Sequence, residues 1–253
     1  MDYGIPYMGS KRKLAKKIID VIHAEQPNAI YFYDLFGGGG AVSFAALESG
    51  CFERVVYNEL NLGVANLLRH LQTSGVTEDM RTWISRELFH RHKNDDDYFG
   101  GYVKTCWSFG NNQRDYLYGR HIEQIKKEDH ELFLAGGKPK IQPAHVGRVH
   151  TLQNLQNLQN LEIFSEPYDK AATDTQAGQT VIYCDPPYQN AAGYPTGVFD
   201  HDAFFAWCKN SKYVVYVSEY NAPLDVVAEW PKTSTLSATN NHKKTIEKLY
   251  RNR

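Results

Sequence analysis

The residues with the clearest potential for chemistry form the tetrapeptide Asp185-Pro186-Pro187-Tyr188, directly after the apolar run 181–184. Proline has no backbone N–H and a fixed φ, so the strand predicted over that run must end at this corner. Open α/β sheets bind ligands at the carboxyl ends of their strands. Asp185 and the Pro186 carbonyl could each accept a hydrogen from an amino group, while Tyr188 stacks on a flat ring. The corner therefore indicates a site for a base with an exocyclic amino group, the alternative being an ordinary strand followed by a turn.

A second candidate site is the glycine run Gly37–Gly40. A strand is predicted before it, over 30–36, and a helix after it, over 41–47. Strand, glycine loop and helix in this order form the first unit of a nucleotide-binding α/β sheet. The next predicted strand, 54–57, ends beside Glu59, where an acid can bind ribose hydroxyls. The pattern predicts a nucleoside cofactor.

The identity of that cofactor stays open from these residues, because NAD and S-adenosylmethionine both use such a unit. Val42 stands where the third glycine of the pattern G-x-G-x-x-G would be, and no Walker lysine follows the glycines. Both facts weaken a dinucleotide or a nucleoside triphosphate as the ligand.

The N-terminal segment 4–14 combines glycines, a proline and several cations ahead of a predicted first helix. Ser10 is the expected N-cap of that helix. Tyr7 and Lys11 could close over a ligand, giving an aromatic face and a cation for a carboxylate. The alternative is a basic helix with a flexible lead-in.

The character of the chain changes at about residue 76. The stretch 102–120 mixes aromatic, amide and arginine side chains around a Gly-Asn turn. Such side chains hydrogen-bond to base edges and stack or wedge between bases. The alternative is a surface loop with its own small aromatic cluster. We expect a helix over 121–134 and a basic loop over 136–150.

The second half of the chain returns to the sheet. The Leu-Gln-Asn repeat of 152–162 fits neither a helix nor a strand period, so we expect an irregular or helical connector there. Tyr168 is either a side chain that flanks a cofactor ring or an exposed loop residue. We further predict strands over 161–164, 213–218 and 245–250, a helix over 201–209, and a lid-like loop over 189–200.

Composition sets limits on the class of protein. A net charge of -1 and a pI near 6.8 argue against a general polyanion-binding coat. The four scattered cysteines predict reduced thiols without disulfides, zinc or another metal. Because no apolar run approaches the 18 residues of a membrane span, and no signal peptide is visible, we expect a cytoplasmic protein.

Three motifs in fixed order carry a resemblance to a known family: Pro6–Lys11, Asp34–Gly39 and Asp185–Tyr188. The chain resembles the Dam-type (D12 class) DNA N6-adenine methyltransferases. Ser218–Tyr220 and Glu247–Tyr250 are similar to the later strands of that family.

The resemblance implies an α/β, Rossmann-like S-adenosylmethionine-dependent methyltransferase fold with a seven-stranded mixed sheet. The catalytic domain would comprise 1–75 and 151–253. An inserted, mainly helical target-recognition domain would occupy 76–150. The implied cofactor is S-adenosylmethionine, the partner is double-stranded DNA, and we expect a monomer.

The resemblance and the patterns above together give a set of site residues. Expected to bind the cofactor are Tyr7, Lys11, Asp34, Phe36, Gly37, Gly38, Gly39, Glu59, Tyr168 and Asp185. Glu59 departs slightly from the family, which often has Asp there. Expected at the catalytic corner are Asp185, Pro186, Pro187 and Tyr188. The hairpin-like stretch 109–119 and the later loop supply the expected DNA contacts, Asn111, Asn112, Arg114, Tyr116, Arg120 and Phe199.

The implied activity is methyl transfer to the N6 amino group of an adenine flipped out of duplex DNA. Hydrogen bonds from that amino group to Asp185 and the Pro186 carbonyl would aim the nitrogen lone pair at the methyl group. Direct displacement needs no covalent enzyme intermediate, so Cys184 has no nucleophilic role. Alternatives are methylation of cytosine N4, methylation of RNA or protein, and a DNA-binding remnant without activity. The enzyme would act alone or beside a restriction nuclease.

Overall fold

The computed structural model describes residues 3–155, 157–171, 175–188, 199–233 and 244–253. Its centre is a seven-stranded sheet in the order β3-β2-β1-β4-β5-β7-β6. The strands are β1 Tyr31–Asp34, β2 Arg54–Asn58, β3 Leu161–Phe164, β4 Thr180–Cys184, β5 Val214–Glu219, β6 Asp225–Thr233 and β7 Lys244–Arg251. The strands β1 to β5 pair in parallel, and β7 pairs antiparallel with β5 and with β6. This confirms the mixed seven-stranded α/β fold.

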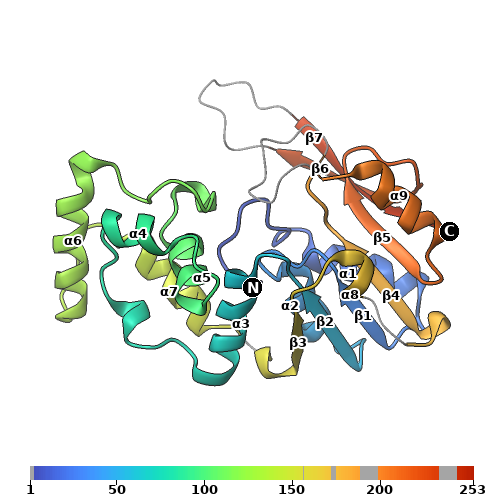
Figure 1. Ribbon diagram of the computed structural model, residues 1–253, viewed down its shortest axis with the longest axis horizontal. Helices are drawn as coiled ribbons and strands as arrows, with labels where there is room; N and C mark the ends of the chain where they lie inside the picture. The colour runs from blue at the N-terminus through green and yellow to red at the C-terminus, as the bar shows by residue number, and fades with distance from the viewer. Residues whose placement is uncertain (1–2, 156, 172–174, 189–198, 234–243) are drawn as a thin grey trace.

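Helices cover both faces of the sheet (Figure 1). On one face lie α1 Ala15–Glu25, α2 Ala41–Ser49 and α3 Leu62–Ser74; on the other lie α8 Tyr168–Ala171 and α9 His201–Asn210. Neighbouring residues of one strand point to opposite faces: Phe32 packs with the first set of helices and Tyr33 with the second. Burial on both faces explains why the central strands are rich in valine, isoleucine and tyrosine.

The register of β1 and β4 creates the ligand-binding edge. Asp34 pairs with Tyr183, so the residues that follow both strands emerge side by side. From β1 the chain continues to β2 on one side, while β4 lies on the other. This reversal of strand order is the point at which open α/β sheets bind ligands.

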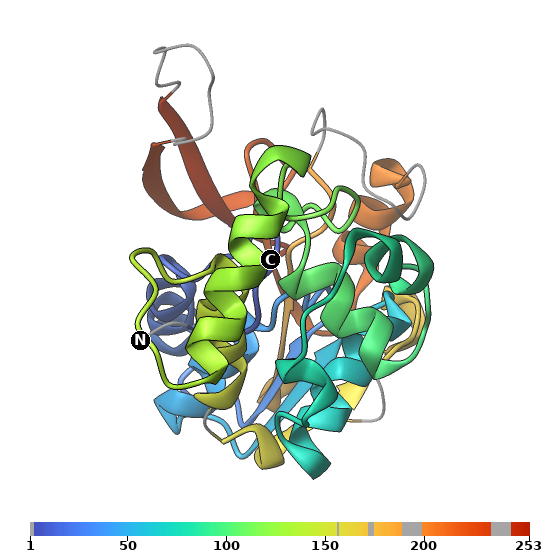
Figure 2. The same ribbon diagram turned by 90° about the vertical axis from the view of Figure 1, so that its left-hand side faces the viewer.

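The segment between α3 and β3 forms a mainly helical unit beside the sheet, with α6 farthest from it (Figures 1 and 2). Its helices are α4 Arg86–His92, α5 Tyr98–Cys106, α6 Arg120–Leu134 and α7 Ala144–Gln153. Short 3-10 turns occur at η1 Asp79–Arg81, η2 Phe109–Asn111, η3 Leu158–Asn160 and, before β4, η4 Ala177–Gln179.

This insertion packs directly on α3 through two glycines. A Cβ atom on Gly101 of α5 would lie 1.9 Å from the carbonyl oxygen of Gly63 in α3, so only glycine allows this approach. Buried residues of the insertion belong to the same hydrophobic cluster as those of α1, α2 and α3. The division of the chain at residues 76 and 150 remains a prediction about sequence segments; the described hydrophobic core does not divide there.

Three local predictions were wrong or incomplete. The expected loop over 136–150 contains most of α7, whose buried His145, Val149 and Leu152 lie at helical spacing. Ser10 does not cap the first helix, because α1 begins at Ala15 and the Lys11 carbonyl accepts the first N–H bonds. The edge strand β6 was not predicted; its Pro231 is tolerated because β6 is the outermost strand of the sheet.

The other predicted elements are confirmed within a few residues, including β3, α6, α9 and β7. The chain from 152 to 162 is irregular and partly helical, as expected, except at Gln156, which lies outside the described residues. The turn predicted before β7 and most of the lid-like loop 189–200 also lie outside them.

Candidate functional site

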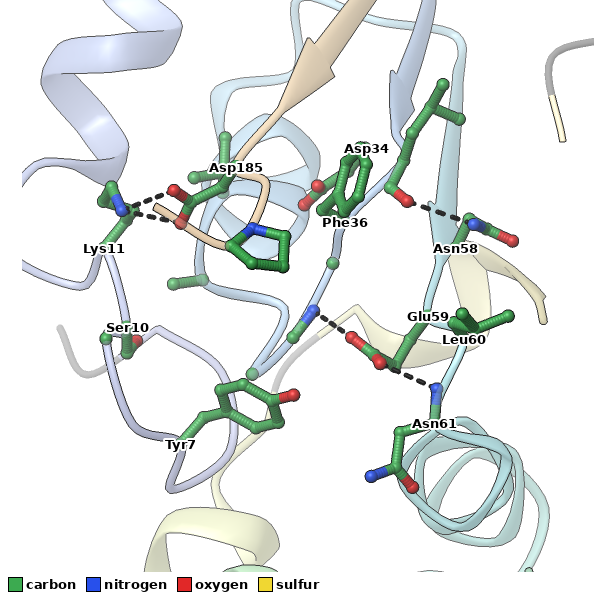
Figure 3. Close-up of a pocket in the computed structure, with 18 of the residues that line it drawn as sticks. Tyr7, Ser10, Lys11, Asp34, Phe36, Asn58, Glu59, Leu60, Asn61 and Asp185 are labelled. Carbon is green, nitrogen blue, oxygen red and sulfur yellow. Dashed lines mark hydrogen bonds and ion pairs between the residues drawn. The ribbon is translucent and has the colours of Figure 1, made fainter. Parts of the chain in front are cut away.

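A cavity of about 410 Å³ opens at the carboxyl ends of β1, β2 and β4 (Figure 3). Four separate segments meet around it: the N-terminal loop, the glycine loop after β1, the turn after β2 and the corner after β4. Lining residues include Tyr7, Ser10, Lys11, Asp34, Phe36, Gly37, Gly38, Gly39, Glu59, Asn61, Gln113, Tyr168, Asp185, Pro187, Tyr188 and Phe199. Every residue predicted to bind a cofactor is therefore at one cavity.

The catalytic corner is joined to the N-terminal loop by a buried cation. Lys11 Nζ donates to both carboxylate oxygens of Asp185, at 2.7 Å to Oδ1 and 2.6 Å to Oδ2. The same ammonium lies 3.5 Å from Oε1 of Glu247 in β7. Tyr188 donates its hydroxyl hydrogen to Glu247, and Lys11 Nζ lies 4.7 Å from the centre of the Tyr188 ring. The Lys11 ammonium thus contacts two carboxylates and one face of the Tyr188 ring.

The electrostatics of Asp185 reflect competing effects. Burial raises the pKa of its carboxyl above the ordinary value, the Lys11 ammonium opposes the rise, and the Glu247 carboxylate adds to it. The ion pair with Lys11 keeps a charged acceptor available at the corner.

Not all of the tetrapeptide faces the cavity. Asp185, Pro187 and Tyr188 are among its described lining residues, whereas Pro186 is buried and is not among them. The Pro187 carbonyl is 2.8 Å from Nε2 of His201, at the start of α9. This contact ties the corner to the helix that follows the loop.

Glu59 is held by two backbone N–H groups at the end of β2. Gly38 N donates to Oε2 at 2.8 Å, and Asn61 N donates to Oε1 at 2.8 Å. Burial raises the pKa of Glu59, and these two bonds oppose the rise. The carboxylate therefore bridges the glycine loop and the start of α3 (Figure 3).

The glycine loop is shaped by close contacts on both sides. A Cβ atom on Gly37 would lie 2.2 Å from the ring of Tyr57, and one on Gly38 would lie 3.1 Å from the ring of Tyr7. Gly38 also has a φ of +50°, which favours glycine. Tyr7 accordingly covers the loop, and its contact with a ligand stays a prediction.

Asp34, at the end of β1, lines the cavity and has one buried carboxylate oxygen without a described partner. Its Oδ2 accepts a hydrogen bond of 2.7 Å from Ser43 Oγ, whereas Oδ1 has none. Burial raises the pKa of this carboxyl to about 7. Ser10 Oγ, which also lines the cavity, is similarly buried without a partner. Such atoms are costly unless a ligand or water satisfies them.

Three aromatic side chains form one wall of the cavity. Phe36 stacks on Tyr168 with ring centres 5.5 Å apart, and Phe199 meets Phe36 edge-on at 5.7 Å. Tyr168 is positioned by the turn after β3, because Asn58 bonds both the carbonyl and the N–H of Glu166. The structure thus places Phe199, which was predicted to contact DNA, beside residues predicted to bind the cofactor.

The predicted DNA-contacting stretch forms a hairpin. Phe109 N donates to Asp115 O at 2.7 Å, and Leu117 N donates to Trp107 O at 2.8 Å. Arg114 and Arg120 are exposed, and Asn111 and Asn112 are partly exposed. The hairpin itself is confirmed, and its contact with DNA stays a prediction.

Tyr116 requires a correction. It is buried, its hydroxyl donates to the Ile84 carbonyl at 2.8 Å, and its ring packs with Trp107 and Phe89. A tyrosine in this position stabilises the base of the hairpin and is not available to DNA. The exposed aromatic residue of the hairpin is Phe109, at 64% exposure.

Sequence reasoning missed several side chains that shape the site. Asn61 donates its N–H to Glu59 and its amide to Gln113. Asn58 holds the turn at Glu166, and Glu247 lies beside Lys11. The signal for Asn58 and Asn61 was their place on either side of Glu59 after a predicted strand. Gln113 and Glu247 lie in stretches that the sequence analysis singled out, but no local pattern indicated their partners, which belong to distant segments.

Two features of the described part of the chain concern membranes and metals. No helix there is long and apolar enough to cross a membrane. Within the same residues, no cluster of three or more His, Cys, Asp or Glu side chains could hold a metal ion.

Comparison with known proteins gives one family. The family of D12 class N6 adenine-specific DNA methyltransferases matches residues 7–133 and 148–250. Among solved structures, the crystal structure of SMU.472 complexed with SAH matches with 13% identity and a TM-score of 0.35. That match covers 95% of this chain and 52% of the other, so the chain spans about half of that protein's length. A likeness at this level carries no functional argument, and no curated protein matches significantly.

The family match covers both halves of the sheet, most of the insertion and the residues of the cavity. The chain belongs to the D12 class N6 adenine-specific DNA methyltransferase family.

Proposed function

We propose that the protein transfers a methyl group from S-adenosylmethionine to the N6 amino group of an adenine flipped out of duplex DNA at a specific sequence. The observation that carries the proposal is the position of Asp185. Its carboxylate is fixed by Lys11 at the carboxyl end of β4, in the same cavity as the glycine loop and Glu59. The same cavity thus contains a hydrogen-bond acceptor for an amino group and a site for a nucleoside.

The cavity fits the cofactor chemically. The unpartnered Oδ1 of Asp34 would accept from the amino group of the methionine moiety, and the glycine loop leaves room for it. Glu59 would accept from the ribose hydroxyls, because a carboxylate retains acceptor capacity beyond its two backbone bonds. The stacked pair Phe36 and Tyr168 would form one side of the adenine site. The described lining of the cavity includes four acidic side chains and one lysine, which also suits a cationic ligand.

When bound, S-adenosylmethionine supplies an electrophilic methyl group, whose bond to sulfur breaks, leaving the electron pair on sulfur, as its bond to nitrogen forms. The target nitrogen is a weak nucleophile because its lone pair is delocalised into the purine. Asp185 would accept a hydrogen bond from the amino group and draw the nitrogen toward tetrahedral geometry. The nitrogen must lose one proton on methylation, and a carboxylate oxygen of Asp185 would receive it. Lys11 would keep that carboxylate charged and in position.

A base in a duplex cannot reach this cavity, so it would have to leave the stack at a cost of a few kcal/mol. Stacking on Tyr188 would offset about 1–3 kcal/mol of that cost. Since Lys11 Nζ lies over one face of the Tyr188 ring, the base would use the other face. The exposed Phe109, together with Arg114 and the hairpin asparagines, would contact the duplex from which the base departs.

The decisive experiment incubates the protein with labelled S-adenosylmethionine and unmethylated duplex DNA, followed by digestion to nucleosides. Label in N6-methyladenine is expected. Label in N4-methylcytosine would show that the target base is cytosine and not adenine. Label in RNA or protein, and none in DNA, would show that the substrate belongs to another class.

Asp185→Ala tests the mechanism in the same assay. We expect turnover to fall at least about 100-fold while S-adenosylmethionine binding persists. Cys184→Ser is the matched control, because Cys184 is buried and its raised thiol pKa gives no reactive thiolate. Substantial turnover by Asp185→Ala would refute the proposed role of the carboxylate.

A further inference from the structure

We propose that Gln113 is a positioning residue that couples the DNA-facing hairpin to the cofactor pocket through Asn61. The inference rests on the proposed function, since it assigns a route by which DNA contact and cofactor binding influence each other. Gln113 is in the insertion, yet it lines the same cavity as the glycine loop.

The contact consists of a short chain of hydrogen bonds. Asn61 Nδ2 donates to Gln113 Oε1 at 3.2 Å, and the backbone N–H of Asn61 donates to Glu59 at 2.8 Å. The other oxygen of Glu59 accepts from Gly38 N at 2.8 Å. Thus two hydrogen bonds link Gln113 to Glu59, and a third links Glu59 to the glycine loop.

The hairpin is built to present this side chain. Gln113 has a φ of +60°, a conformation that glycine and asparagine adopt more readily than glutamine. Its N–H donates to Ser108 Oγ at 3.0 Å, and Ser108 Oγ in turn donates to the Lys104 carbonyl at 2.7 Å. Backbone strain that persists at a ligand site is a mark of function. Here it directs an amide into the cavity.

A second side chain of the insertion reaches the same asparagine. Lys104, buried in α5, donates from Nζ to Asn61 Oδ1 at 3.1 Å. Asn61 Oδ1 also accepts from Val64 N at the first turn of α3. Lys104 and α3 therefore fix the orientation of the Asn61 amide, so that its Nδ2 faces Gln113.

The consequence is a reciprocal effect on binding. Movement of the hairpin on DNA would change the Gln113–Asn61 contact and the support of Glu59. By linkage, a cofactor that orders Glu59 would favour the DNA-binding arrangement of the hairpin by the same factor. We expect this factor to be about 5- to 20-fold, toward the lower part of the range typical of coupled sites.

The test measures the dissociation constant of S-adenosylhomocysteine with and without duplex DNA that contains the mapped methylation site. The dissociation constant of the same DNA is measured with and without S-adenosylhomocysteine. The variants are Gln113→Gly, which removes the amide and suits the positive φ, and Gln113→Asn, which keeps an amide one methylene shorter. Gln124→Ala, at an exposed glutamine of α6, is the control.

In the wild type and in Gln124→Ala, each ligand should tighten the other by the same 5- to 20-fold factor. In Gln113→Gly and Gln113→Asn, the factor should fall below about 2-fold while both ligands still bind. A purely structural role in the turn would leave the coupling intact in Gln113→Gly, because glycine relieves the backbone strain. Retained coupling in that variant, or none in the wild type, would overturn the inference. Failure of the wild type to bind DNA at all would overturn the proposed function itself.

Discussion

The ammonium of Lys11 lies 2.6 Å from the carboxylate of Asp185, although 174 residues separate them in the chain. Lys11 precedes α1, and Asp185 follows β4. Their contact brings the N-terminal loop over the catalytic corner, and Glu247 of β7 joins the same lysine. Ion pairs as well as packing therefore hold the N-terminal loop over the catalytic corner.

Replacing Lys11 tests how much these ion pairs stabilise the protein. In Lys11→Met the buried Glu247 and the partly buried Asp185 lose their shared cation, so the free energy of unfolding at pH 8 should fall by about 3–5 kcal/mol. Urea denaturation measures the change. Lys16→Met is the control, because its pair with Asp20 is exposed and worth at most about 1 kcal/mol. Equal stability of the two variants would show that the buried pair contributes little.

Asp34 should make cofactor binding depend on pH. Its carboxyl has a pKa raised to about 7, so close to half of the unliganded protein carries a proton there at neutral pH. A ligand amino group favours the charged form of the Asp34 carboxylate, so cofactor binding should release protons near pH 7. Below pH 7 the affinity for the cofactor should fall by up to about tenfold per pH unit.

Calorimetry of S-adenosylhomocysteine binding, in buffers with different ionisation enthalpies, measures this proton release. Asp34→Asn removes the titrating group and should abolish the release near pH 7. The assignment to Asp34 fails if that variant releases the same number of protons.

A buried pair of histidines in the insertion should make its stability sensitive to acid. His145 lies 2.9 Å from the Tyr118 hydroxyl and 2.9 Å from His130. Burial, together with His130 and Arg148, lowers the pKa of His145 to about 3. The neutral form is therefore favoured in the folded state, and stability should be lost as pH falls from about 6.5 toward 3.

The loss should approach about 1.4 kcal/mol per pH unit in this window. Thermal denaturation between pH 7.5 and 5 measures it. His145→Phe should flatten the pH dependence, whereas His150→Gln, at an exposed histidine, should not. If stability depends on pH equally steeply in His145→Phe and in the wild type, other groups cause the acid sensitivity.

Phe109 should matter for DNA and not for folding. With its side chain 64% exposed, Phe109→Ala should change the free energy of unfolding by no more than about 0.5 kcal/mol. If the ring fills space left by a flipped base, affinity for the target duplex should fall by about tenfold. Fluorescence of 2-aminopurine at the target position should report less base flipping. Ile141→Ala, at another exposed apolar residue, is the control; an equal effect there would remove any special role from Phe109.

Much of the fold could be predicted from local pattern. The glycine loop between β1 and α2, the stop of β4 at Asp185 and the acid after β2 all depend on residues close in sequence, because turns and strand ends are set by local backbone chemistry. Helix α7 was missed although its buried residues have helical spacing, because the surrounding cations and glycines suggested a loop.

The tertiary structure alone decided which distant side chains complete the site. Glu247 reaches Lys11 only because β7 pairs antiparallel with β5, and Gln113 reaches Asn61 only because α5 packs on α3. It also decided that Tyr116 is buried while Phe109 is exposed, although both are aromatic residues of one hairpin. The sequence determined the chemistry of each segment, because that chemistry depends on neighbouring residues. The partners of each segment were decided by long-range packing, which no local pattern contains.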